Sequence, residues 1–353
     1  MSAATDRGLD AALAEIAAGA SRRDAAGPVG GFPHEPFALL RRAGALGLTV
    51  GPRPVSTGEE WGAVRAVSRA DASVGRIYDG HLNAVERIAL LAPEPLRGEE
   101  LAAVSDGERL LGVWGADPVT DEGEPARLTE GATLRGVKVF CSGAGGLDRA
   151  IVLVRAPDGS GPPLLAYVDL GSPYVEIDRA WFAGAGLRAA ESHRVVFHDT
   201  PVLALLGEPG VISAEPVFSR DAIRTAAMWA GIADCAAAAA LDALAARPER
   251  SELAGLAAAR IATAHTTIDL YLAEATRRAD APELARFALE LREAVTTAVR
   301  TLLDEAARAL GSRPFATGSA LDRARRDLEL FLLQKRLDPL LARAGNRLLE
   351  GRA

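Results

Sequence analysis

Residues 195–210, VVFHDTPVLALLGEPG, decide the fold of this chain because they join two kinds of sequence. The first half is β-branched and apolar, which is typical of a β-strand. Gly207, Pro209 and Gly210 then mark a turn. The alanine-rich stretch 225–246 follows and predicts a packed helix. We therefore expect a β region to give way to a helical region near residue 213.

The chain upstream of this boundary predicts a β domain over residues 108–212. Segments 134–140, 151–154 and 164–170 are short apolar or alternating runs. Clusters of Gly, Pro, Asp and Ser separate these runs, as turns separate short strands. We therefore expect a central domain of β-barrel or β-sandwich type.

The chain downstream predicts a four-helix bundle over residues 213–353. Apolar side chains recur every three or four positions up to a stop at Gly311, which predicts one long amphipathic helix. Ser319 and Asp322 have the spacing of a capping box. The expected bundle helices are 225–246, 254–278, 284–310 and the segment from Ser319. Four long helices favour an antiparallel bundle.

Residues 1–107 also predict helices. Trp61, Val64 and Val67 are three residues apart, which places them on one helical face. A chain with helices, then short strands, then helices has an α+β fold. We expect three domains: an N-terminal helical domain (1–107), a central β domain (108–212) and a C-terminal helical bundle (213–353).

Composition excludes some classes of partner. The 353 residues include 40 basic and 47 acidic side chains, so the net charge of −7 argues against a nucleic-acid binder. Cys141 and Cys235 form no disulfide framework, and residues 1–8 lack the apolar core of a signal peptide. Asp234 and Asp242 interrupt the most apolar stretch, which argues against a membrane span. We expect a cytoplasmic protein.

Common catalytic motifs are incomplete or missing in the sequence. Residues 142–146 are glycine-rich, but Asp148 stands where GxGxxG requires its last glycine. No HExxH or GxSxG string occurs. The five histidines are far apart without ligand spacing, so no metal site is expected.

Several strings, in order along the chain, resemble motifs of the acyl-CoA dehydrogenase superfamily of flavoproteins. The matching strings are 44–48 (GALGL), 69–73 (RADAS), 134–144 (LRGVKVFCSGA), 195–210 and 319–327 (SALDRARRD). The resemblance runs from about Phe32 to Gly351. It implies an acyl-CoA dehydrogenase-like fold with the same three domains, and a bound flavin, with FAD expected and FMN as the alternative.

The resemblance also implies which residues contact the flavin. The strand matched by residues 134–144 lies against the flavin in the family. Phe140 takes the position of the aromatic residue that flanks the ring system, and Cys141 follows it. Ser142 takes the position of a hydroxyl residue that reaches flavin N5, and serine keeps that hydroxyl.

A second segment of the resemblance concerns the polar edge of the flavin. Trp114, Gly115 and Ala116 stand in the family's loop whose backbone holds the pyrimidine edge, although the usual Thr-Glu pair is missing. Aromatic residues make up only 5% of the chain. Trp114 and Phe140 are therefore the few aromatic residues expected to wall a flavin.

The catalytic base of the family is not in its usual place. Family dehydrogenases use a glutamate to remove the substrate α-proton, and the usual position, counted from Asp327, holds Lys335. Another subgroup carries the carboxylate at the start of the first bundle helix, which corresponds to Asp221. Asp221 is therefore our candidate base. An acid that stabilises a helix N-terminus is the alternative interpretation.

His81 is the second candidate catalytic residue. It lies with Tyr78, Asp79 and Asn83 in a polar cluster among apolar neighbours. The alternative interpretation is a histidine whose hydrogen bonds are satisfied inside the helical domain.

The family string RxQFG, which binds FAD across the subunit interface, is also missing. Residues 247–253 occupy its place without Phe or Gly. Reduced flavin delivered by a separate reductase is one way to supply the cofactor without that string.

These observations leave three hypotheses for function. The first is α,β-dehydrogenation of an acyl thioester, on CoA or on a carrier protein, with an electron-transfer protein as acceptor. The second is a flavin-dependent monooxygenase or N-hydroxylase, which needs a dry pocket and a hydrogen-bond donor near N5 but no base. The third is a non-catalytic partner subunit of an active relative. The broad Ala/Leu faces of the bundle favour a homodimer or homotetramer.

Overall fold

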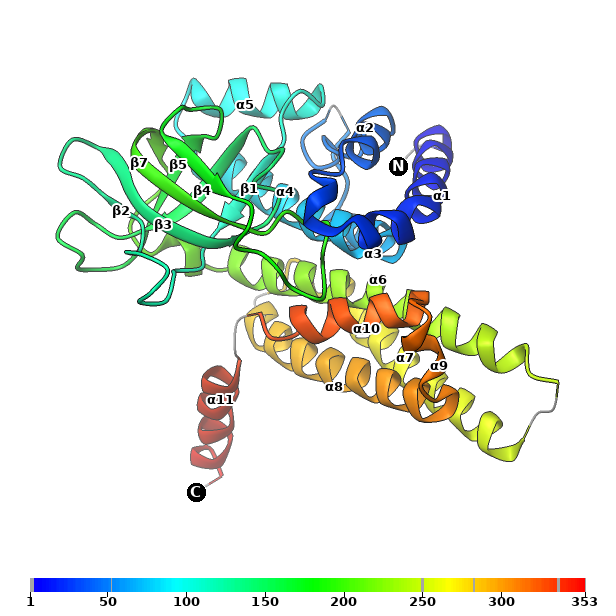
Figure 1. Cartoon of the computed structure of the whole chain (residues 1–353). Helices are drawn as coiled ribbons and strands as arrows, with labels where there is room; N and C mark the ends of the chain where they lie inside the picture. The colour runs from blue at the N-terminus through cyan, green and yellow to red at the C-terminus, as the bar shows by residue number, and fades with distance from the viewer. Residues whose placement is uncertain (1–2, 52, 249–250, 282, 335–336, 353) are drawn as a thin grey trace.

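The computed structural model in Figure 1 describes the chain except residues 1–2, 52, 249–250, 282, 335–336 and 353. Three regions follow one another along the chain: a group of helices, a curled β-sheet and a second group of helices. The predicted α+β fold, with an N-terminal helical region, a central β region and a C-terminal helical bundle, is confirmed.

The N-terminal region is built from helices. Its elements are α1 (Ala3–Ala26), η1 (Gly27–Gly30), α2 (His34–Arg42), α3 (Thr57–Ala70), α4 (Ala72–Leu91) and α5 (Leu96–Ser105). The Ser56 hydroxyl accepts from the Glu59 N–H while the Glu59 carboxylate accepts from the Ser56 N–H, so α3 begins with a capping box. Asp71 alone separates α3 from α4, and its carboxylate accepts from the N–H groups of Ser73 and Val74.

The central region is a seven-stranded sheet that curls because one long strand belongs to both of its halves. The strands are β1 (Leu111–Trp114), β2 (Arg127–Leu128), β3 (Thr133–Cys141), β4 (Arg149–Val154), β5 (Leu164–Asp169), β6 (Val175–Asp178) and β7 (His193–Leu205). The order is β1-β4-β5-β7-β3-β2, and β6 pairs with β7. β1 runs parallel to β4, while the other pairs are antiparallel.

The C-terminal region contains the long helices. After η2 (Val211–Ser213) come α6 (Val217–Ala245), α7 (Glu252–Arg277), α8 (Leu284–Leu310), α9 (Arg313–Ala316), α10 (Ala320–Phe331) and α11 (Asp338–Glu350). The Ser319 hydroxyl accepts from the Asp322 N–H, which confirms the predicted helix start. α8 ends at Gly311 as predicted. α11 lies apart from the bundle in Figure 1, and none of its residues is buried.

The predicted domain boundaries fall in connecting segments. Residue 107 lies between α5 and β1, and residue 212 lies inside η2. Whether each region forms an independent domain stays a prediction.

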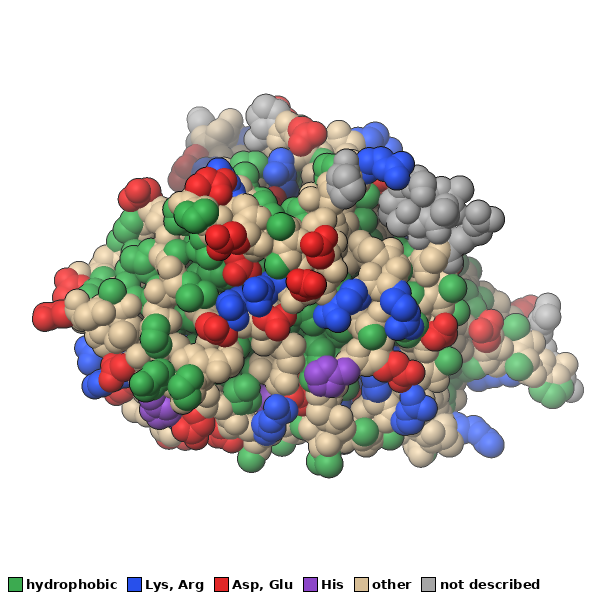
Figure 2. Space-filling view, turned by 90° about the horizontal axis from the view of Figure 1, so that it is seen from above, with side chains coloured by type: hydrophobic (Ala, Val, Ile, Leu, Met, Phe, Trp, Pro, Cys, Tyr) green, Lys and Arg blue, Asp and Glu red, His purple; other side chains and the backbone are tan. Residues whose placement is uncertain are grey.

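α6 is the central helix of the molecule. Among the residues that the structure describes, it is the one helix long and apolar enough to cross a membrane. However, 61% of its most apolar window is buried inside the protein, as in the core helix of a soluble fold. On the face shown in Figure 2, acidic and basic side chains are interspersed, which does not favour a track for nucleic acid.

α3 and α6 cross at close range because Gly231 has no side chain. A β-carbon at Gly231 would lie 2.1 Å from the carbonyl oxygen of Arg65 and 2.9 Å from the backbone nitrogen of Arg69. Both neighbours are backbone atoms of α3, so they cannot rotate away. The packing of the N-terminal region on the bundle therefore requires glycine at this position.

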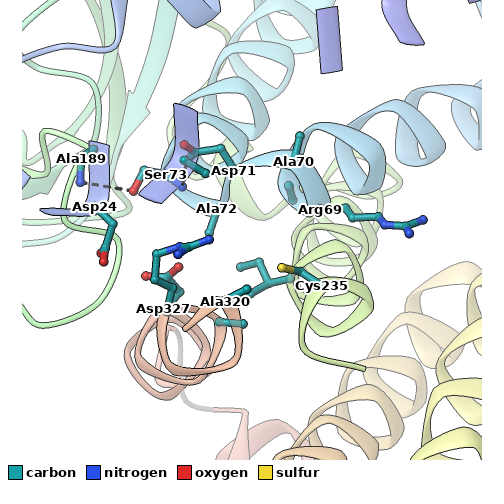
Figure 3. Close-up of a pocket in the computed structure, with 15 residues that line it drawn as sticks. Asp24, Arg69, Ala70, Asp71, Ala72, Ser73, Ala189, Cys235, Ala320 and Asp327 are labelled. Atoms are coloured by element: carbon teal, nitrogen blue, oxygen red, sulfur yellow. Dashed lines mark hydrogen bonds between the residues drawn. The ribbon is translucent and has the colours of Figure 1, made fainter. Parts of the chain in front are cut away.

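A small cavity marks the junction of the N-terminal helices, the bundle and the segment before β7 (Figure 3). Its volume of about 30 Å³ suits a water molecule or two, not a substrate. The dashed line in Figure 3 is the bond from the Ala189 N–H to the Ser73 hydroxyl, 3.2 Å long. The Leu187 N–H donates to Asp327 at 2.6 Å. Asp327 thus fastens the segment before β7 to α10.

Asp327 also has an unusual acidity. Burial raises the pKa of its carboxyl from 3.8 to about 7, although the Leu187 N–H opposes this and the neighbouring Asp71 adds to it. The folded protein thus keeps this proton at a pH where the unfolded chain has lost it. Stability is therefore lost as the pH rises from about 4 to about 7.

The close crossing predicts a large effect of one methyl group. Gly231→Ala is expected to lower the free energy of unfolding by about 1–3 kcal/mol, because the backbone of α3 must move. Gly255→Ala is the matched control, since a β-carbon there meets no atom within 4 Å and alanine favours helix. The control is expected to be neutral or more stable by up to about 1 kcal/mol. Equilibrium urea unfolding measures the free energy of unfolding of both variants. Equal values would contradict the close approach of α3 and α6 at Gly231.

The raised pKa of Asp327 predicts a pH-dependent gain in stability. Asp327→Asn keeps an oxygen for the Leu187 N–H but has no proton to lose. The variant is expected to be more stable than the parent at pH 8 by up to about 4 kcal/mol, with the gain disappearing near pH 4. Thermal unfolding at several pH values tests this, with the exposed Asp304→Asn as control. A gain that is constant with pH would refute the assignment.

Candidate functional site

Phe140 is an exposed aromatic side chain on an irregular part of β3. The pairing register of β3 with β7 shifts between Lys138 and Cys141, and Phe140 has a left-handed backbone with φ of 53°. Its side chain is 51% exposed and meets the Trp181 ring edge-on at 4.9 Å between centroids. A strained backbone that presents an aromatic ring to solvent is a feature of binding sites.

Ser142 forms a buried hydroxyl pair with Ser192. The two Oγ atoms are 2.9 Å apart, and the residues are 8% and 5% exposed. Within the described residues neither hydroxyl makes another hydrogen bond. One hydroxyl donates to the other, so the second keeps a hydrogen for a further acceptor. The pair therefore offers one donor that the protein itself does not use.

The segment after β1 is fastened beside this pair. The Trp114 indole N–H donates to the Ser142 carbonyl at 3.1 Å, and the Val139 N–H donates to the Ala116 carbonyl at 3.2 Å. Lys138 donates to the Gly115 carbonyl at 3.3 Å. Gly115 and Ala116 are exposed. The structure thus brings the predicted cofactor residues of two distant segments together.

Trp114 and Cys141 differ from the other predicted cofactor residues because both are buried. The Trp114 side chain is 2% exposed, so it supports the Ser142 turn from behind rather than presenting a face. Cys141 is fully buried, and burial raises the pKa of its thiol well above 9.0. The thiol is therefore neutral and not a nucleophile.

These residues fit a flavin. The exposed Phe140 ring suits one face of a flat ring system, and the unused hydroxyl of the serine pair suits an atom such as N5. The exposed backbone of Gly115 and Ala116 suits a polar ring edge. Flavin chemistry would take place where these three features meet.

Sequence reasoning missed residues 191–193, of which Ser192 pairs with Ser142 and Glu191 supports the neighbouring turn. Glu191 is fully buried, pairs with Arg179 at 2.5 Å, and lies 3.2 Å from the His193 ring nitrogen. A β-carbon at Gly145 would lie 1.9 Å from the Glu191 carboxylate. The glycine-rich turn 142–146 therefore packs on this segment and is not a phosphate loop.

His81 is fully buried and bonded to backbone on both sides. Its Nε2 lies 3.0 Å from the Leu46 carbonyl, and its Nδ1 accepts from the Leu111 N–H at 3.1 Å. Burial lowers its pKa to about 4, so the ring is neutral at pH 7. This geometry favours the structural interpretation, in which His81 fastens α4 to β1.

Asp221 lies in the first turns of α6 and is already engaged. One carboxylate oxygen accepts from the Asn83 amide at 2.6 Å and lies 3.5 Å from the Arg224 guanidinium. The other position considered for a base, Lys335, lies outside the described residues, as does Arg250 in the place of the missing FAD string. Asp221 thus takes part in a network of buried charges.

A groove of about 830 Å³ opens beside Asp221, between α6, α8 and α11. Its walls are mainly apolar, with Phe218, Ala222 and Leu289 among them, and Arg292 lies in it. This volume is in the range of small-molecule sites. Within the described residues no group of three or more His, Cys, Asp or Glu side chains is arranged to hold a metal ion.

Comparisons with known proteins give a partial sequence match and several structural matches along the chain. No protein-family model matches the chain. A dibenzothiophene monooxygenase of Rhodococcus qingshengii is 28% identical over 175 residues, which is 46% of this chain and 42% of the relative. The match thus spans less than half the length of either protein.

Solved structures match along nearly the whole chain. TdsC of Paenibacillus sp. A11-2, a dibenzothiophene monooxygenase solved with FMN and indole, has a TM-score of 0.81 at 21% identity and covers 98% of both chains. The methanesulfinate monooxygenase MsuC of Pseudomonas fluorescens has a TM-score of 0.78 at 20% identity, over 98% of this chain and 96% of that one. This chain therefore has the fold of the acyl-CoA dehydrogenase superfamily, as its sequence motifs predict.

Proposed function

We propose that this protein is a flavin-dependent monooxygenase that uses reduced flavin. The observation that carries the proposal is the state of Asp221, the candidate base, whose carboxylate is held by Asn83 and faces the Arg224 guanidinium. These contacts fix the orientation of one Asp221 oxygen; a dehydrogenase needs its carboxylate aimed at the substrate α-proton, whereas a monooxygenase needs no such base. The similar proteins described as monooxygenases support this second hypothesis over dehydrogenation.

FMN is our proposed cofactor in place of FAD. The string that binds FAD across subunits in the family is missing at residues 247–253. The solved structures of TdsC that contain a flavin hold FMN. FMN reduced by a separate reductase and then bound here is consistent with both observations. A homo-oligomer in the cytoplasm stays part of the proposal.

The residues of the site have distinct roles in this proposal. Reduced flavin, when bound, activates dioxygen, so that one oxygen atom enters the substrate and the other leaves as water. Ser142 supplies a hydroxyl to the ring, and Ser192 holds that hydroxyl in place. Phe140 covers one face and excludes water, which protects the reaction from unproductive decay.

The proposal predicts substrate-dependent oxygen consumption. Purified protein with FMN, NADH and a flavin reductase is expected to consume oxygen above the reductase background when indole or dibenzothiophene is added as a first probe. An oxygen electrode and chromatography of the products measure this. Anaerobic bleaching of bound oxidised flavin by an acyl-CoA would instead support the dehydrogenase. Failure to bind FMN or FAD in either redox state would support the non-catalytic hypothesis.

The hydroxyl pair predicts the effect of two variants. Ser142→Ala is expected to slow product formation about tenfold or more, because a hydrogen bond to the cofactor is lost. Ser192→Ala is expected to have a smaller effect in the same direction, since Ser142 loses only its support. Ser160→Ala, in an exposed loop, is the control. Full activity of Ser142→Ala would contradict the role of the pair.

Asp221 separates the two enzyme hypotheses. Asp221→Asn keeps an oxygen for the Asn83 amide but cannot accept a proton from substrate. A monooxygenase is expected to keep its activity within about tenfold, whereas loss of a general base lowers activity by about 10²–10⁴-fold. The initial rate of oxygenation in the reductase assay measures the difference. If Asp221→Asn loses about 10²–10⁴-fold of the activity but unfolds at the same temperature as the parent, Asp221 is the catalytic base.

A further inference from the structure

Arg292 of α8 is a buried arginine that pairs with no acid in the part of the chain that the structure describes. It is 5% exposed, and no carboxylate of the described residues forms an ion pair with it within 4.0 Å. Its Nε has no hydrogen-bond partner, and one of its terminal nitrogens donates weakly to the Gln334 carbonyl at 3.3 Å. Its guanidinium stacks over the Trp229 ring, 4.3 Å from the centroid. Buried arginines are almost always paired, so this arrangement calls for a reason.

The acids around Arg292 are already bound to other groups. Asp79 pairs with Arg76 at 2.7 Å, and Glu86 pairs with Arg224 at 2.6 Å. The facing charges are Arg76, Arg87, Arg220, Arg224 and Arg292 against Glu60, Asp79, Glu86 and Asp221. Arg220 also pairs with Asp280 at 3.4 Å, so five arginines face five carboxylates. Arg292 lines the groove together with Asp221, and its Nε is left without a hydrogen-bond partner.

Arg292 stays charged despite its burial. Burial lowers its pKa to about 10, with Asp221 and Asp79 partly opposing this. The guanidinium is therefore protonated at pH 7 and holds unused N–H donors in a place with little water. Such a group binds anions more strongly than an exposed arginine does.

The groove provides room for the rest of a ligand. It has a volume of about 830 Å³, and apolar side chains of α6, α8 and α11 line most of it, Leu289 and Leu340 among them. A row of contacts joins Arg292 to the flavin-binding turn. Arg292 stacks on Trp229, Trp229 meets Phe331 edge-on, and Phe331 faces Arg76 of α4. The next residue of α4, Ile77, packs against Gly143.

We propose that Arg292 binds a terminal oxyanion of the ligand, such as a carboxylate, sulfinate or phosphate, while the apolar part of that ligand lies in the groove. A planar guanidinium with a free Nε suits two oxygens of one such group. If the oxyanion belongs to the substrate, the inference deepens the proposed function, on which that assignment rests. The phosphate of FMN has the same chemistry and is the other source.

Two probes that differ only in charge test the site. The full-length protein, without flavin, is titrated calorimetrically with indole and with indole-3-carboxylate at pH 7. The carboxylate is expected to bind about tenfold more tightly or better, since hydrogen bonds between charged groups are worth about 1.5–3 kcal/mol. Arg292→Met is expected to abolish this preference. Arg300→Met, an exposed arginine of the same helix, is expected to keep it.

A second titration distinguishes the two sources of the oxyanion. If FMN binds Arg292→Met more weakly while riboflavin binds unchanged, and the indole probes show no charge preference in the parent, the oxyanion is the cofactor phosphate. If the probe preference disappears and FMN binding is unchanged, it belongs to the substrate. If Arg292→Met changes neither the preference for indole-3-carboxylate nor the affinity for FMN, the proposal is wrong. A parent that binds no flavin but prefers the carboxylate would refute the proposed function and keep the anion site.

Stability separates a binding role from a structural one. A buried charge without a partner disfavours folding, so Arg292→Met is expected to unfold at the same temperature as the parent or a higher one. Arg292→Lys, which keeps the charge, is expected to retain part of the preference for the carboxylate. If Arg292→Met unfolds several degrees lower and Arg292→Lys also loses the preference, Arg292 holds the helices together and the inference is wrong.

Discussion

The buried guanidinium of Arg224 is the interaction on which the rest of the structure depends. It is fully buried on α6 and binds Glu60 of α3 and Glu86 of α4. Removing any one of these partners leaves an uncompensated charge in the interior, which destabilises a fold by about 3–5 kcal/mol. The three helices must therefore keep their relative positions. Asn83 then meets Asp221, and Ile77 of α4 supports the turn that carries Ser142.

Much of the fold could be predicted from periodicity, and the exceptions have physical reasons. The amphipathic pattern of 284–310 predicts α8. The pattern is clear because the apolar face of this helix is buried from Leu284 to Ala306. The start of α4 at Ala72 is not visible in the periodicity, because it depends on the Asp71 carboxylate, which caps α4 after a single-residue break. The sequence did not predict α11 as a separate helix. None of its residues is buried, so its apolar residues do not mark a face packed on the core.

The site was predictable only where it follows one strand. The motif around Phe140 and Ser142 places two residues of the site from the sequence alone. Ser192 could not be found in the same way, because it meets Ser142 across 50 residues through the pairing of β3 with β7. The bond from Asn83 to Asp221 spans 138 residues, so the sequence offered a carboxylate but not its partner. The sequence shows which polar groups are present. Whether such a group is free to bind a ligand depends on its tertiary contacts, which the sequence does not show.

Availability of polar groups also explains how one fold can serve two kinds of chemistry. Proton removal needs a carboxylate with a free lone pair beside the substrate, while oxygen transfer needs a hydroxyl donor and a dry aromatic wall. In this chain one carboxylate oxygen of Asp221 is held by Asn83, and the Ser142–Ser192 pair keeps an unused hydrogen. The buried Arg292 adds a third available group, because its Nε has no hydrogen-bond partner. A fold that leaves hydroxyl and guanidinium donors free has the groups needed to bind an anionic molecule.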